Sequence, residues 1–367
     1  MENLTHSLVG GLLAQTRLGK QLPYTTPVLV IAANLPDIDV IWASRGGTEY
    51  LEAHRGITHS VVGIISLAVI FSGICWFALR RFRKGQESAF PGFGTVFWPI
   101  FAALVTHPIL DWTNNYGIRP WLPFSNHWYY GDIVVVVDPW LWLILGGTLF
   151  VIASKTRLGI AAWAVLTIIL SFVIFTGLGG RVQVPHTARI VWVIGLAIVA
   201  AAKVFAKPTQ TEPVAVFGLS LMVIYWAALF AIHLMAVAYS TDTAEWIGRP
   251  MKVSAYPMPA DPIHWMCIGE TPDAIYQVNA FAFSGADWKQ ATRLPKEVTP
   301  EMLSQIQTTE AGRAFLSFAR TYSSKVISGA DENVVQLRDL RFGLMISAKF
   351  DKDFNLLSVN FGLASGR

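Results

Sequence analysis

The chain contains 367 residues, of which 53% are hydrophobic and only 14% are charged, and its mean hydropathy is +0.46. A soluble globular protein carries about 25% charged residues, so this composition excludes an ordinary soluble fold and indicates a membrane protein. The net charge is +4, but the basic residues fall mainly in short clusters between apolar runs, a pattern typical of membrane topology rather than of nucleic-acid binding.

The N-terminal sequence has no basic segment followed by a cleavage site, so we expect residue 1 to begin the mature chain. Two short apolar segments, 4–18 and 27–42, come first, and we expect them to form either tilted short spans or a re-entrant pair. Six later runs reach the roughly 20 residues that a membrane helix needs. They cover residues 57–79, 92–110, 133–153, 158–178, 188–206 and 214–238.

Basic residues near helix ends predict the orientation of these spans. The cluster "RRFRK" at 80–84 follows the first long run, Lys155 and Arg157 separate the third run from the fourth, and Lys203 and Lys207 separate the fifth from the sixth. These three loops alternate along the chain, and the loops between them carry fewer basic residues over longer stretches. We therefore expect a multi-pass inner-membrane protein with these three loops in the cytoplasm.

Hydrophobicity falls after residue 238, which indicates a soluble domain outside the membrane. Strand-like stretches at 274–283, 343–351 and 354–362 surround a segment, 299–322, that begins with Thr-Pro and has helical patterning. The predicted fold is an α-helical polytopic membrane protein with about six long spans, two short N-terminal helical segments and a small C-terminal α+β domain. We predict a metal-site membrane domain at 1–180, additional spans at 181–238 and an extracytoplasmic domain at 239–367.

The predicted topology places nine ionisable residues at one level, near the outer face of the membrane. Such residues are costly in or beside membrane spans unless they are paired, hydrated or metal-bound. Five carboxylates at close range would repel one another, and a divalent cation converts that repulsion into attraction. The nine are His6, Asp37, Asp39, His54, His59, His107, Asp111, Asp132 and Asp138.

Local spacing supports a metal site. His107 and Asp111 are four residues apart, so a helix presents both on one face. Asp37 and Asp39 would share a face in an extended segment but would diverge on a helix, and the sequence leaves both options open. His54 and His59 are five residues apart, so we expect His54 in the loop before the helix. Imidazole and carboxylate donors together favour zinc, and manganese and iron accept the same donors.

Four short motifs resemble those of the YdjM-like family of inner-membrane, metal-dependent hydrolases, which is distantly similar to zinc-dependent phospholipase C and single-strand nucleases. They are "THSLVGG" at 5–11, "LPDIDVIW" at 35–42, "HRGITHS" at 54–60 and "THPILDWTNNYG" at 106–117. The resemblance covers about the first 140 to 180 residues. It implies a hydrolase with the metal ligands His6, Asp37, Asp39, His54, His59, His107 and Asp111. Asp132 and Asp138 are added from topology alone.

We therefore expect metal-assisted hydrolysis of a phosphoester or lipid-like substrate at the outer face, with zinc as cofactor and the bilayer as partner. Asp39 or Asp132 would orient or deprotonate a water molecule, and Arg55 would hold a phosphate. Two alternatives remain: a metal-ion or proton-coupled transporter, and a non-catalytic scaffold stabilised by metal. The near absence of charge in the inner halves of the spans favours an enzyme over a transporter. We expect no nucleic-acid partner, and the sequence identifies no protein partner.

Overall fold

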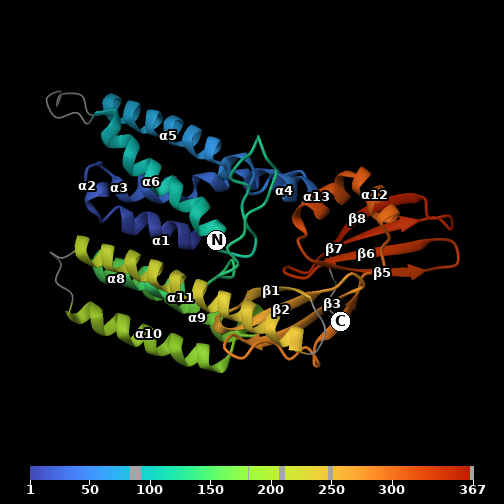
Figure 1. Ribbon diagram of the computed structural model, residues 1–367. Coiled ribbons are helices and arrows are strands. Elements are labelled where there is room, and N and C mark those ends of the chain that lie inside the picture. Colours follow the sequence, from blue (N-terminus) through green and yellow to red (C-terminus); the bar gives the residue numbers. More distant parts are fainter. Residues whose placement is uncertain (83–91, 181, 206–210, 247–250, 364–367) are drawn as a thin grey trace. The chain divides into compact units, whose positions relative to one another are not determined.

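The computed structural model describes residues 1–82, 92–180, 182–205, 211–246 and 251–363 (Figure 1). The chain forms two compact units. The first, here called the membrane unit, comprises Met1–Ile38, Arg55–Ala231 and Pro257–Pro262. The second, the sheet unit, comprises Asp39–His54, Ile232–Tyr256 and Ile263–Arg367.

Six helices among the described residues are long and apolar enough to cross a membrane, which confirms the predicted fold class. They are Thr25–Ser44, Val61–Arg81, Phe93–Trp112, Arg157–Gly177, His186–Phe205 and Thr211–Trp246. Most of the predicted long runs correspond to one of them. The basic residues Arg83, Lys84 and Lys207, used in part to predict the topology, lie outside the described residues.

Two of the predicted segments differ from the structure. The second short N-terminal segment is part of a full-length span, because α3 (Thr25–Asn34) continues directly into the 3-10 helix η1 (Leu35–Ser44). Pro36, which lacks an N–H group, stands where the α-helical pattern ends. The predicted run at 133–153 becomes helical only at Pro139, because Asp138 caps that helix and accepts a hydrogen bond from the Trp140 N–H at 2.8 Å. The resulting helical stretch, Pro139–Ala153, is shorter than a typical span.

The membrane unit also contains several helices that position the side chains described below. Gly10 allows α1 to lie close to α3, since a Cβ atom at that position would lie 2.6 Å from the Leu29 carbonyl oxygen. The remaining helices are α1 (Asn3–Leu13), α2 (Arg17–Lys20), η2 (Ile57–His59), α5 (Val61–Phe82), α6 (Phe93–Trp112), α7 (Pro139–Leu141), the π-helix η4 (Trp142–Gly146), α8 (Gly147–Ala153), α9 (Arg157–Gly180), α10 (His186–Phe205) and α11 (Thr211–Trp246).

An ion-pair group joins two ends of helices in the membrane unit. Glu212, in the first turn of α11, lies 3.1 Å from the Arg17 Nε and 3.3 Å from the Lys20 Nζ. The start of α11 and the α2 segment therefore lie at the same end of the unit, as the predicted topology requires. The pairs are partly exposed, so their contribution to stability is small.

The sheet unit contains two four-stranded antiparallel sheets and short helices, in agreement with the predicted α+β domain. The three predicted strands correspond to β3, β7 and β8, and β7 pairs with β8 as the predicted hairpin. The strand order follows the sequence, β1-β2-β3-β4 in one sheet and β5-β6-β7-β8 in the other. The strands are β1 (Lys252–Met258), β2 (Asp261–Glu270), β3 (Ala274–Phe281), β4 (Thr292–Pro295), β5 (Tyr322–Ser328), β6 (Asn333–Asp339), β7 (Leu344–Phe350) and β8 (Leu356–Leu363).

The predicted helical segment between the sheets is divided into two helices by a second threonine cap. Thr299 caps α12 (Pro300–Thr308) by accepting from the Met302 N–H at 3.3 Å, and Thr309 caps α13 (Glu310–Phe318) through the Gly312 N–H at 3.1 Å. Within the same unit, α13 packs against α4 (Gly47–Ala53).

Candidate metal centre

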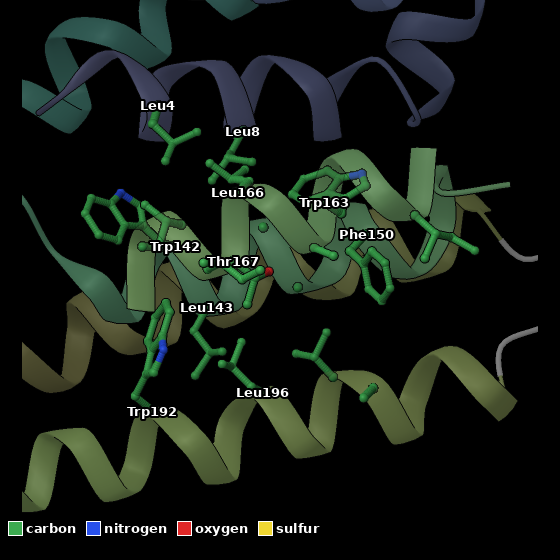
Figure 2. Close-up of a pocket in the computed structure, with 18 residues that line it drawn as sticks. Leu4, Leu8, Trp142, Leu143, Phe150, Trp163, Leu166, Thr167, Trp192 and Leu196 are labelled. Atoms are coloured by element: carbon green, nitrogen blue, oxygen red, sulfur yellow. The ribbon is translucent and has the colours of Figure 1, made fainter. Parts of the chain in front are cut away.

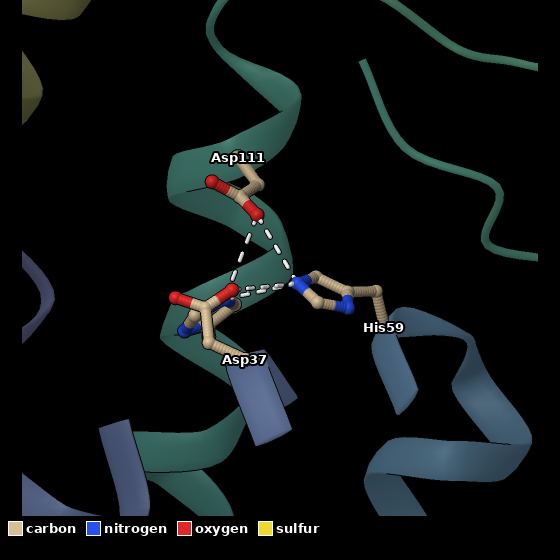
Figure 3. Close-up of side chains that lie close together, drawn as sticks. Asp37, His59 and Asp111 are labelled. Atoms are coloured by element: carbon tan, nitrogen blue, oxygen red, sulfur yellow. Dashed lines mark hydrogen bonds and ion pairs between the residues drawn. The ribbon is translucent and has the colours of Figure 1, made fainter. Parts of the chain in front are cut away.

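Four side chains of the membrane unit converge on one small region. Asp37, His59, His107 and Asp111 each present a ligand atom, and these four atoms all lie within 4.8 Å of one another. Figure 3 shows Asp37, His59 and Asp111 approaching from separate segments of the chain. We call these residues the four-residue cluster. Both histidines and Asp111 are buried, so the cluster is largely shielded from solvent.

The separations between the ligand atoms match a shared metal ion. Oδ1 of Asp37 lies 3.4 Å from Nε2 of both His59 and His107, and Oδ2 of Asp111 lies 3.3 Å and 3.5 Å from the same two nitrogens. The two imidazole nitrogens are 3.1 Å apart. Ligand atoms bound at about 2.1 Å to one tetrahedral zinc lie about 3.4 Å from one another. The cluster therefore has the spacing that a single tetrahedral ion requires.

The hydrogen bond on the far side of His107 determines which nitrogen faces the cluster as an acceptor. Nδ1 of His107 lies 2.6 Å from the Ala33 carbonyl oxygen. Because a carbonyl only accepts, Nδ1 carries a hydrogen, and in the neutral ring Nε2 then directs a lone pair towards Asp37 and Asp111. A lone pair facing two carboxylates is favourable only with a cation or proton between them.

Each carboxylate of the cluster has one oxygen held by other residues and one directed at the imidazoles. Asn3 donates to Oδ2 of Asp37 at 2.9 Å, which leaves Oδ1 facing the two histidines. Arg55 contacts Oδ1 of Asp111 at 2.9 Å, and the amino group of Met1 also contacts this oxygen. Oδ2 of Asp111 is buried and has no hydrogen-bond partner among the described residues. This orphaned oxygen is the atom that a metal ion would satisfy.

Comparison with known proteins identifies the N-terminal part of the chain. Residues 1–179 match the model of the family described as YdjM inner membrane protein. We call these residues the YdjM region. This match and the six apolar helices support a multi-pass inner-membrane protein. All members of the four-residue cluster lie within this YdjM region.

One relative is the uncharacterised protein YfhP of Bacillus subtilis (strain 168), which is 28% identical over 108 residues. The match covers 29% of this chain, and the chain spans only 30% of that relative's length. No solved structure matches the chain.

The helices of the YdjM region explain why the cluster forms. His107 and Asp111 lie one turn apart on α6, as their spacing predicts. His59 lies in η2, immediately before α5. Asp37 lies in η1, and residues two apart on a 3-10 helix point in directions about 240° apart. In the structure Asp37 is a member of the four-residue cluster, and Asp39, on the same helix, is not.

Three other predicted ligands occupy different positions. His6 stacks on His107 with ring centroids 3.7 Å apart, and its Nε2 lies 3.5 Å from Oδ1 of Asp111, so it packs beside the four-residue cluster. Asp39 and His54 belong to the sheet unit and pair with each other, with Oδ1 and Nδ1 3.0 Å apart.

Asp132 and Asp138, which were added from topology alone, lie outside the four-residue cluster. Asp138 receives hydrogen bonds from the backbone at the start of α7 and from the Tyr225 hydroxyl at 3.0 Å. Its carboxylate thus acts as a helix cap in place of the predicted metal ligand. Asp132 is buried in the loop after α6 with a left-handed backbone, φ 55°.

Arg55 has a clear positioning role in the YdjM region. Besides Asp111, its guanidinium donates to the Asn114 Oδ1 and the Gly117 carbonyl at 3.0 Å each, and it lies 4.4 Å from the Tyr116 ring centroid. These contacts join the end of α6 to the loop that follows. The predicted role in holding phosphate remains a prediction, because most of the group already contacts protein acceptors.

Sequence reasoning missed Asn3. An uncharged amide gives no compositional signal, but Asn3 and His6 are three residues apart and so share one face of α1. That spacing, next to a predicted ligand, is the signal that would have identified it.

Proposed function

We propose that the chain is a membrane-embedded, metal-dependent hydrolase that acts on a phosphoester of a lipid or lipid-linked substrate. The four-residue cluster carries this proposal, because it combines two imidazoles, two carboxylates and an orphaned buried oxygen at the spacing of a tetrahedral ion. Asp37, His59, His107 and Asp111 would hold the ion. Zinc suits these donors best, and such an ion supplies a water of lowered pKa and polarises a phosphoryl oxygen.

Asp39 remains the proposed proton acceptor. His54 Nδ1 lies 3.0 Å from Asp39 Oδ1 and would hold this carboxylate in place while it accepts a proton from water. Asp39 is not a member of the four-residue cluster, so all four donors of the cluster are retained when Asp39 is changed, and turnover is expected to fall.

Purified protein is expected to hydrolyse at least one member of a panel of phospholipids and simple phosphodiesters, and a chelator is expected to abolish this turnover. An Asp39→Asn variant is expected to lose about 100-fold or more of the rate, the usual contribution of a general base, when it is compared with the unmodified protein at equal metal content. Asp273→Asn, at an exposed site in the turn between β2 and β3, is the matched control.

Metal-loaded protein that turns over no member of the panel would contradict the proposed hydrolase function. Metal uptake into proteoliposomes would instead support a transporter. Full turnover by Asp39→Asn would remove Asp39 from the mechanism.

We also propose that the sheet unit faces the outside of the inner membrane. Basic residues at or beside the ends of three helical segments, Arg80, Lys155 and Lys203, support a cytoplasmic location for the loops that carry them, and so an outer location for the sheet unit. In a chain carrying Cys75→Ser and Cys267→Ser, Asp331→Cys is expected to react with an impermeant maleimide in intact spheroplasts, since Asp331 is almost fully exposed. Lys155→Cys, also exposed, is expected to react only after permeabilisation. The reverse labelling would invert the topology.

A further inference from the structure

The membrane unit contains an apolar cavity of about 360 Å³ between α1, η4, α8, α9 and α10 (Figure 2). This volume falls in the range of roughly 300–1,000 Å³ that small-molecule sites occupy. Protein interiors are normally packed without spaces of this size. The cavity is therefore a candidate binding site separate from the four-residue cluster.

The residues that line the cavity favour a hydrocarbon ligand. They include no charged side chain, and Thr167 provides the one side-chain hydroxyl among them. Two indole N–H groups of the wall are already bonded to protein oxygens, that of Trp142 to Glu2 at 2.5 Å and that of Trp192 to Ser171 at 3.0 Å. Because α9 and α10 have the length and composition of membrane spans, lipid chains are the abundant apolar molecules around this cavity.

Helix α1 contributes side chains to both the cavity and the four-residue cluster or its neighbours. Asn3 contacts Asp37 and His6 stacks on His107, whereas Leu4 and Leu8 line the cavity. These two sets lie on different faces of one helix, as the 3.6-residue period requires. The cap of the same helix, Glu2, is the hydrogen-bond partner of the wall residue Trp142.

We propose that this cavity binds the hydrocarbon chain of the substrate while its phosphoester lies at the metal centre. The substrate class is then a long-chain lipid phosphoester. The claim that the bound lipid is a substrate rests on the proposed hydrolase function. Binding of the hydrocarbon chain in the cavity can be measured without turnover.

Gly146→Leu is the variant that tests the cavity. A Cβ atom at Gly146 would lie 3.6 Å from Leu8 Cδ1 and 3.8 Å from Trp163 Cζ3, which are ordinary contacts, so the added side chain fills the space without displacing the backbone. Gly73→Leu is the matched control, because Gly73 lies in α5, outside the cavity lining, and a Cβ there meets no atom within 4 Å.

The probe is a palmitoyl phosphatidic acid with a diazirine near the end of the chain, present in phosphatidylcholine vesicles. Mass spectrometry of the labelled protein is expected to locate the crosslinks at cavity residues such as Trp163 and Leu196. Gly146→Leu is expected to reduce this labelling at least tenfold, and Gly73→Leu is expected to leave it unchanged. An excess of unlabelled phosphatidic acid should compete more effectively than diacylglycerol with the same chains, which separates a substrate from bulk lipid.

Crosslinks spread evenly over lipid-facing positions such as Phe172, or labelling that Gly146→Leu does not change, would overturn the inference. Equal competition by diacylglycerol would also overturn it, because the cavity would then hold any lipid chain.

A second measurement compares turnover of long-chain and water-soluble phosphoesters. If Gly146→Leu reduces neither rate, the inference fails and the hydrolase stands. If neither substrate is cleaved while the cavity is still labelled, the proposed hydrolase function fails by itself.

Discussion

Replacing His59 or His107 by alanine is expected to remove the bound metal from the purified protein. Each substitution deletes one of four donors, and the remaining carboxylates would repel each other at a separation below 4.8 Å. Since changes behind a metal ligand already cost about 10- to 100-fold in affinity, loss of a ligand is expected to cost at least about 100-fold. Elemental analysis after extensive dialysis measures the metal-to-protein ratio.

His127→Ala is the control for this experiment. His127 is exposed in the loop after α6, and its ring contacts Tyr129, outside the four-residue cluster. The control is expected to retain the metal of the unmodified protein. Full metal content in both His59→Ala and His107→Ala would show that the four-residue cluster is not the metal site.

An Arg55→Ala variant is expected to lose roughly 3–5 kcal/mol of stability, the usual effect of removing one partner from a buried ion pair. Arg55 is buried and contacts Asp111, Asn114 and Gly117, so its removal leaves several buried acceptors without a donor. Unfolding in detergent, followed by tryptophan fluorescence, measures the loss.

Two further variants define the cause of this loss. Arg55→Lys keeps the positive charge but lacks the planar guanidinium group with its several N–H donors. We therefore expect its stability to lie between those of Arg55→Ala and the unmodified protein. Arg45→Ala removes an exposed arginine that stacks on Trp42 at 4.4 Å, and a loss of only about 0.5–1 kcal/mol is expected. An Arg55→Ala protein as stable as Arg45→Ala would mean that Arg55 does not support the centre.

Local periodicity made part of the four-residue cluster predictable. The spacing of His107 and Asp111 identifies two ligands on one helical face, and the structure brings both together. The choice between Asp37 and Asp39 was not predictable, because it depends on a 3-10 helix that no pattern of apolar residues distinguishes from an extended segment.

Residues that hold the predicted ligands in place through hydrogen bonds were harder to predict. Asn3 and Arg55 act through hydrogen bonds to Asp37 and Asp111, and these contacts depend on how distant segments pack. The role of Asp138 was ambiguous for a related reason, since a carboxylate before a helix either caps it or binds a metal, and only the neighbouring backbone N–H groups decide between them.

The strength of the local signal decided which strands were predicted. The β7–β8 hairpin has strand-like stretches on both sides of a short polar turn. In contrast, β1 and β2 contain or adjoin Pro257 and Pro262, and proline disfavours a strand assignment. Only two residues separate β1 from β2, and the two strands are neighbours in their sheet, so the prolines and not a long sequence separation conceal them.

The order of the ligands along the chain has a consequence for biogenesis. All four residues precede position 112, whereas α9, α10 and α11 follow it. During synthesis, all four side chains are therefore available to one another before the later helices leave the ribosome.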